Sequence, residues 1–166
     1  MLQPNLAVDS EAIIHLAFPF QKAQREKFKA GKLGEQWAKR YPELFDHNDL
    51  GLYRNQSKRG FHFFEWLAAI IIYEATGYLS LVEKYGCAGH RRKLPLWENI
   101  APACIQNLQC KNGWPDLFAI SPDQKDWFFC ETKGKDKLSA AQLECFTAIY
   151  AASGKKVYVF RFVERL

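Results

Sequence analysis

Two carboxylates and an amine lie in two neighbouring apolar segments of this 166-residue chain. Asp116 stands at the start of the first segment, and Glu131 and Lys133 stand at the end of the second. The polar residues 121–126 between the segments, which include Pro122, predict a turn and therefore two adjacent strands. If these strands pair, Asp116 lies near Glu131. Since Glu131 and Lys133 are two residues apart, they point to the same face of the sheet.

Such a group of side chains is suited to phosphoryl chemistry assisted by a metal ion. Two close carboxylates repel each other unless a cation or a proton lies between them. Magnesium typically uses one or two carboxylates together with phosphate oxygens. The Lys133 ammonium adds a positive charge for a phosphate or an attacking hydroxide. The residues therefore indicate a site for Mg²⁺ or Mn²⁺.

The wider pattern resembles a known nuclease signature. Pro115-Asp116, fourteen further residues and then Glu131-Thr132-Lys133 are similar to the PD-(D/E)XK motif. A longer string resembles the VRR-NUC branch of that superfamily, the virus-type replication-repair nucleases, which include the nuclease domain of the Fanconi-associated nuclease. This string is Gly113-Trp114-Pro115-Asp116-Leu117, Glu131-Thr132-Lys133-Gly134, Asp136-Lys137-Leu138-Ser139 and Gln142. The resemblance covers about residues 61–163.

The resemblance implies an α/β fold with a restriction-endonuclease-like core, in which helices flank a central mixed sheet. It implies that Asp116, Glu131 and Glu65 bind the metal, joined by the carbonyl of Thr132. It implies that Lys133 orients a water molecule or stabilises developing negative charge. Thr132 departs from the apolar residue usual at its position, and we expect this change to be harmless. Cleavage of DNA with 5′-phosphate products, a preference for branched or flap DNA and a homodimer are further implications.

The apolar stretch from Gly60 to Gly77 predicts a buried helix that carries the third acid. Glu65 and Glu74 are nine residues apart, which is two and a half turns, so only one of them can face the metal. PD-(D/E)XK folds carry a metal-binding acid about a dozen residues before a glycine turn, and Glu65 has this placement. We therefore expect Glu65 to be the ligand. The alternative is an ordinary ion pair between Glu65 and a basic residue such as Arg59.

The segment after Lys133 predicts a charged loop, a helix at 138–152 and a final strand. Ser139 is suited to the N-cap, and Gln142 at position N3 completes a capping box. In the family pattern a glutamine at this place helps to organise the site, so Gln142 is a candidate site residue. Pure capping is the alternative. Residues 157–162 alternate less than an edge strand does and predict an internal strand.

Basic residues in two loops predict contacts to DNA phosphates. Arg91, Arg92 and Lys93 lie in the segment 86–112, for which glycine and proline predict irregular structure. Lys135 and Lys137 follow the candidate lysine. For the first group, the alternative is an ordinary solvated loop.

Residues 1–60 lie outside the resemblance and predict a helical accessory extension on a core of residues 61–166, with a dimerisation arm as the alternative. The expected elements are an apolar run at 12–20 broken by Pro19, an exposed helix at 21–32 ended by Gly31 and Gly34, a short helix at 35–45 around Trp37, a loop at 46–60 and, in the core, a first strand at 78–85.

Composition restricts the class of protein. A net charge of +5 suits a polyanionic partner. Five cysteines without an N-terminal signal pattern favour free thiols in a reducing compartment. No apolar run reaches the ~20 residues that span a bilayer, so we expect a cytoplasmic protein without membrane contact. No nucleophilic triad, P-loop or dinucleotide-binding pattern appears.

The sequence therefore predicts a Mg²⁺- or Mn²⁺-dependent DNA endonuclease. One alternative is a catalytically silent DNA-binding module on the same fold. Another is a restriction or mobile-element endonuclease whose sequence specificity lies in residues 1–60.

Overall fold

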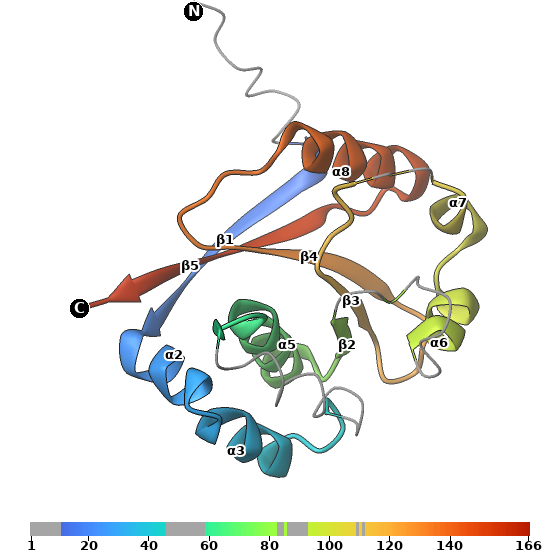
Figure 1. The fold of residues 1–166 in the computed structure, drawn as a ribbon. Coiled ribbons are helices and arrows are strands. Elements are labelled where there is room, and N and C mark those ends of the chain that lie inside the picture. The colour runs from blue at the N-terminus through green and yellow to red at the C-terminus, as the bar shows by residue number, and fades with distance from the viewer. Residues whose placement is uncertain (1–10, 46–58, 83–84, 86–92, 109, 111) are drawn as a thin grey trace, which may run out of the picture.

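A computed structural model describes residues 11–45, 59–82, 85, 93–108, 110 and 112–166. The helices and strands in chain order are β1 (Ile13–Gln21), α2 (Lys22–Lys29), α3 (Lys32–Arg40), α5 (Phe63–Thr76), β2 (Leu79–Val82), α6 (Lys93–Ile100), α7 (Ala103–Gln106), β3 (Leu117–Ile120), β4 (Trp127–Lys133), α8 (Ala140–Ser153) and β5 (Val157–Arg165). The five strands form one mixed sheet in the order β1-β5-β4-β3-β2 (Figure 1). The α/β class is therefore confirmed. None of the helices in this part of the chain is long and apolar enough to cross a membrane.

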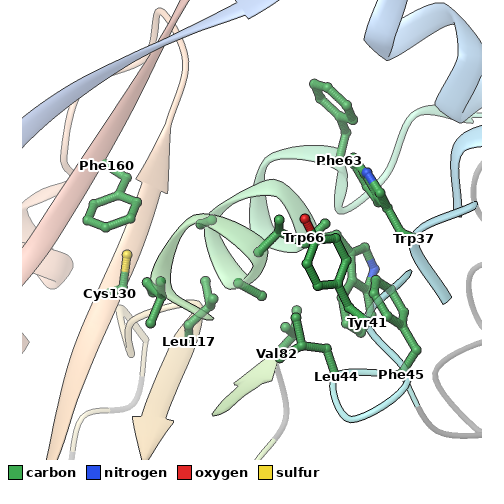
Figure 2. Packing of buried hydrophobic residues seen from close by; sticks show 14 of the residues in the cluster. Trp37, Tyr41, Leu44, Phe45, Phe63, Trp66, Val82, Leu117, Cys130 and Phe160 are labelled. Carbon is green, nitrogen blue, oxygen red and sulfur yellow. The ribbon is translucent and has the colours of Figure 1, made fainter. Parts of the chain in front are cut away.

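Helices cover both faces of the sheet. α8 lies on one face and α5 on the other, with α2 and α3 beyond α5 (Figure 1). The two layers between sheet and helices are filled by two separate clusters of buried apolar side chains. Figure 2 shows the cluster around α5, where the ring of Trp66 stacks on the ring of Phe45 at a centroid distance of 4.7 Å. α5 is thus packed between the sheet and the N-terminal helices.

β3 and β4 form the predicted antiparallel hairpin. Leu117 pairs with Cys130 and Ile120 pairs with Trp127, so Asp116 lies one step before the pairing begins, opposite Glu131. The turn is closed by the Ser121 N–H, which donates to the Asp126 carbonyl at 2.9 Å. Antiparallel pairing with a short polar turn fixes the register of the two strands, and this register brings the candidate acids to one end of the sheet.

Two helix ends follow the sequence prediction closely. α5 ends at Gly77, which adopts the left-handed conformation with φ of 73°. α8 begins after Ser139, whose Oγ accepts from the Gln142 N–H at 3.1 Å, while Gln142 Oε1 accepts from the Ser139 N–H at 3.0 Å. The predicted capping box is therefore confirmed, and it fixes the start of α8 beside the end of β4.

The first strand of the sheet comes from the segment expected to be a helical extension. β1 pairs in parallel with β5 over nine positions, from Ile13 with Val157 to Gln21 with Arg165. The expectation that Pro19 breaks this run was wrong. β1 is an edge strand, and a proline without an N–H is tolerated there because one side of the strand lacks a partner. β5, between β1 and β4, is internal as predicted.

The segment 86–112 is more regular than its glycines and prolines indicated. Its described part contains the helices α6 and α7. Pro95 lies in the first turn of α6, where the missing N–H costs no helical hydrogen bond. Pro102 stands at the N-cap of α7. The prediction of irregular structure was wrong for these residues because a proline at a helix start was taken for a helix breaker.

Candidate functional site

Asp116 and Glu131 meet at the end of the β3–β4 hairpin. The backbone N–H of Asp116 donates to Glu131 Oε2 at 3.2 Å. Glu131 is only 2% exposed, whereas Asp116 is partly exposed. The predicted proximity of the two acids is confirmed, and at least one of them lies where water cannot neutralise its charge.

The hydroxyl of Thr132 makes a contact that sequence reasoning did not anticipate. Asp116 Oδ2 accepts hydrogen bonds from the Thr132 N–H at 2.9 Å and from Thr132 Oγ1 at 2.8 Å. Two donors from one residue fix the orientation of the Asp116 carboxylate. None of the hydrogen bonds described here reaches Asp116 Oδ1, so this oxygen remains available to a further ligand. The threonine at position 132, where an apolar residue is usual, therefore has a structural role. Its hydroxyl was the feature of the sequence from which a hydrogen bond to a nearby acid could have been predicted.

Lys133 is held between two carboxylates. Its Nζ lies 3.1 Å from Glu131 Oε1 and 3.2 Å from Asp136 Oδ2. The side chain is 9% exposed. Asp136 also accepts from the Gly134 N–H at 3.2 Å, which closes the loop after β4. Asp136 is a second residue whose contact with the site the sequence did not lead us to expect. Its place three residues after the lysine, behind a glycine, was the available signal.

Gln142 reaches the site from α8. Its Nε2 donates to Glu131 Oε1 at 2.5 Å, while its Oε1 and backbone N–H take part in the capping box. The capping role of Gln142 is therefore confirmed, and the same side chain also contacts Glu131; its role in organising a catalytic site stays a prediction. The start of α8 and the end of β4 are linked through this side chain.

Glu65 approaches the site from α5, and Glu74 does not. Glu65 is near enough that its charge contributes to the raised pKa of Asp116, and its Oε1 lies 3.6 Å from His62 Nδ1. Glu74 instead accepts a hydrogen bond from the Tyr41 hydroxyl and lies 3.7 Å from Arg40. Of the two acids, Glu65 is therefore the one that lies toward Asp116, and its role as a metal ligand stays a prediction.

Two residues support the loop that carries Asp116. The buried Tyr85 donates from its hydroxyl to the Pro115 carbonyl at 2.7 Å. Gly113 has φ of +99°, and a Cβ placed on it would lie 2.6 Å from the Ala141 carbonyl oxygen. Only glycine combines this conformation with this approach. The loop before β3 is thus packed directly against the first turn of α8, next to Gln142.

The acids of the site bind protons unusually strongly. Burial raises the pKa of Asp116 to about 8, and the charges of Glu131 and Glu65 add to this rise. Burial also raises the pKa of Glu131, against the opposing effects of Lys133, Gln142 and the Asp116 N–H. For Lys133, burial alone would lower the pKa, but its carboxylate partners outweigh burial and raise it. Burial therefore makes the charged form of both acids costly.

A divalent cation would offset this cost, although the described residues alone do not enclose one. Among the described residues, no three histidine, cysteine, aspartate or glutamate side chains form a complete group of metal ligands. The predicted convergence of Asp116, Glu131 and Glu65 on one ion is thus only partly met: the first two are in contact, and Glu65 lies nearby. Carboxylate oxygens with raised pKa and an available Oδ1 suit a cation held by one or two carboxylates, with other oxygens from water or phosphate. A role for the Thr132 carbonyl stays a prediction.

The basic residues predicted to contact DNA have different fates. Lys93 is 4% exposed and its Nζ donates to the Val82 carbonyl at 2.5 Å, so the prediction of a phosphate contact at Lys93 was wrong. Its ammonium provides the hydrogen-bond donor for the backbone carbonyl at the last residue of β2. Arg91 and Arg92 lie outside the described residues. Lys135 and Lys137 are exposed in the loop between β4 and α8, next to the site.

Thr132→Val is expected to raise the pKa of Asp116 further, because the hydroxyl is one of the two groups whose hydrogen bonds lower it. The backbone N–H remains in the variant, so the fold is retained. The measurement is a ¹³C NMR titration of the Asp116 carboxyl carbon. Thr132→Ser keeps the hydroxyl and serves as the control, with a titration close to that of the natural protein. Identical titrations of the valine and serine variants would show that the hydroxyl does not act on Asp116.

Comparison with known proteins gives no assignment, since no protein-family model matches the chain and no curated protein matches it significantly. Function is therefore inferred from the side chains and their contacts.

Proposed function

We propose that the protein is a divalent-cation-dependent nuclease that hydrolyses phosphodiester bonds in DNA, on a restriction-endonuclease-like core. One observation carries the proposal: Asp116 and Glu131 are in contact at the end of a hairpin, with the Lys133 ammonium 3.1 Å from Glu131. This arrangement has the residue types and spacing of the PD-(D/E)XK signature that the sequence resembles. Cleavage of branched or flap DNA, in repair or in the processing of mobile DNA, belongs to the same proposal.

Each side chain has a part that follows from its contacts. Asp116, oriented by Thr132, and Glu131 would be the carboxylates that hold the cation. Mg²⁺ or Mn²⁺, when bound, supplies positive charge for the phosphoryl oxygens of the substrate. Gln142 holds Glu131 in place. Lys133, kept charged by its two carboxylate partners, stabilises the negative charge that develops on the phosphate.

The natural protein is expected to cleave labelled DNA only when Mg²⁺ or Mn²⁺ is present. Asp116→Asn and Lys133→Met are each expected to lower the rate by about 10³-fold, because each removes a charge that acts on the reacting phosphate. The substrates are linear, flapped and four-way DNAs. Asp123→Asn and Lys125→Met are matched controls in the turn at the other end of the hairpin, and they are expected to cleave at the natural rate.

The same assay separates nuclease activity from simple binding. The silent DNA-binding module has one observation in its favour, since Glu131 and Lys133 are both engaged with partners inside the chain. Such a module would bind DNA without cutting it under every metal. Binding without cleavage, or full cleavage by Asp116→Asn, would overturn the proposed function.

A further inference from the structure

An open groove of about 950 Å³ begins at the candidate site. Gly134, which follows Lys133 in the chain, and Phe64, which precedes Glu65, line it side by side: a Cβ on Gly134 would lie 3.2 Å from the Phe64 ring. Phe20 of β1, Arg25 of α2 and Val163 of β5 also line the groove. The groove therefore lies next to Lys133, through Gly134 and Asp136, and extends to β1 and α2, which lie outside the sequence resemblance.

Aromatic rings and an arginine form a column along this groove. The rings of Phe64 and Phe162 stack at a centroid distance of 5.0 Å with an interplanar angle of 1°. The guanidinium of Arg25 lies over the Phe64 ring, 5.3 Å from its centroid. The ring of Phe20 meets Phe64 edge to face at 5.2 Å. The column thus ends in a cation that packing holds in place.

The charges of the groove favour a polyanion. Arg25 is partly exposed, and within the described part of the chain no carboxylate pairs with it. Lys135, which also lines the groove, is exposed. Arg161 donates to the carbonyls of Gly134 at 2.7 Å and Asp136 at 2.9 Å, which fixes the loop that carries Lys135.

Two acids also line the groove, Asp136 and Glu164. The Asp136 carboxylate is paired with Lys133 at 3.2 Å, an ammonium that it shares with Glu131. Glu164 is exposed on β5 and opposes an anionic ligand. Three cationic side chains, those of Arg25, Lys135 and Arg161, therefore line the groove. Among the described residues, Glu164 is the one acid of the groove that has no cationic partner.

We propose that this groove binds a single-stranded segment of polynucleotide that leads into the site, an inference that rests on the proposed nuclease function. Arg25 and Lys135 bind phosphates of this strand. Val163, which is 52% exposed, and the partly exposed Phe64 offer apolar surface to the bases. A single strand fits because its base faces are open to apolar and aromatic contacts, whereas a duplex presents mainly phosphates to a groove of this kind. β1 and α2 thereby belong to the substrate-binding surface.

The test measures binding of a fluorescein-labelled oligothymidylate by fluorescence anisotropy in excess EDTA, so that no cleavage occurs. Arg25→Gln and Lys135→Gln are each expected to weaken binding by about fivefold to tenfold, and to reduce the slope of log K against log [salt] by about 0.7. Lys27→Gln removes the same charge from the exposed side of α2. It is expected to weaken binding by less than about twofold, because salt screens a charge that is remote from the groove. Glu164→Gln is expected to tighten binding.

Each of the following outcomes would contradict the proposed groove. Equal losses in Arg25→Gln, Lys135→Gln and Lys27→Gln would show a response to net charge alone. If Arg25→Gln and Lys135→Gln weakened binding of a blunt duplex of the same length as much as binding of the oligothymidylate, the groove would not select single strands. If the natural protein did not bind the oligothymidylate, single-stranded polynucleotide would be rejected as the ligand of the groove. Circular dichroism confirms that each variant is folded, and the exposed Lys135 provides a test that does not depend on the packing of Arg25.

The groove and the nuclease proposal fail in different ways. Variant-specific loss of single-strand binding in EDTA, together with no cleavage under any metal, would keep the groove and reject the nuclease. Cleavage that depends on Asp116, together with unchanged binding by Arg25→Gln and Lys135→Gln, would keep the nuclease and reject the groove.

Discussion

Replacing Asp116 by asparagine is expected to raise the thermal stability of the cation-free protein at pH 8, and to remove the stabilisation that Mg²⁺ gives to the natural protein. Burial and the nearby charges of Glu131 and Glu65 make a charged carboxylate costly at this position. An asparagine oxygen can still accept both hydrogen bonds from Thr132, and its amide no longer repels the two glutamates. We expect a gain on the order of 2 kcal/mol, which corresponds to about 4–8 °C in Tm.

The pH dependence follows from the same carboxyl group. Its pKa is about 8 in the folded protein and 3.8 for an ordinary aspartate, so between these values the folded state binds more protons than the unfolded chain. The contribution of Asp116 to the free energy of unfolding therefore falls as the pH rises from 3.8 to about 8. The Asp116→Asn variant lacks this dependence, so its advantage over the natural protein grows with pH.

The measurement is the thermal unfolding of both proteins across this pH window, with excess EDTA or with excess MgCl₂. Asp126→Asn is the control of opposite sign, because the Lys155 ion pair and the Tyr78 hydroxyl hold the pKa of Asp126 below its usual value. That carboxylate stabilises the fold above its unfolded pKa, so its loss lowers Tm at pH 8. If Asp116→Asn lowered Tm at pH 8 in the same way, the site would not hold unbalanced negative charge.

Gly113→Ala is expected to lower the free energy of unfolding by about 3 kcal/mol or more, or about 6–12 °C in Tm. The backbone at Gly113 has φ of +99°, and the added Cβ would lie 2.6 Å from the Ala141 carbonyl oxygen and 2.7 Å from the Gln142 nitrogen. The backbone strain at position 113 and the clash with the backbone of Ala141 and Gln142 add together, so either the loop before β3 or the start of α8 must move. Because Gln142 holds Glu131, the variant is also expected to lose cation binding.

Gly154→Ala separates the clash from the strain. Gly154 also has positive φ, +71°, but a Cβ at this position meets no atom within 4 Å. This control therefore costs only the left-handed conformation, about 1–2 kcal/mol. Thermal unfolding of the two variants measures the difference. Equal losses of Tm would show that the loop before β3 moves freely away from α8.

The parts of the fold that sequence predicted well depend on local signals. Residues 121–126 mark a turn between two apolar runs, and turn chemistry sets the register that places Asp116 opposite Glu131. Ser139 and Gly154 mark the ends of α8 through their capping roles. In each case the residues that decide the structure lie within a few positions of one another in the chain.

The parts that sequence missed depend on partners that are distant in the chain. β1 contains Pro19 and several exposed side chains, and its partner β5 comes much later, so no local pattern marks it as a strand. Lys93 stands in a basic run, which usually indicates solvent, but it is buried where the Val82 carbonyl needs a donor. The role of the Thr132 hydroxyl becomes visible only when the hairpin has placed Asp116 beside it.

The parallel pairing of β1 with β5 has a consequence for how the protein forms. Ile13 pairs with Val157, so the two strands come together only after the long segment between them has been made. Pairings of such long sequence separation form slowly because a very large loop must close first. At ~5–20 residues per second of synthesis, the nascent chain spends several seconds with the apolar residues of β1 uncovered. The segment that completes the sheet is thus also the segment most exposed to misassembly on the ribosome.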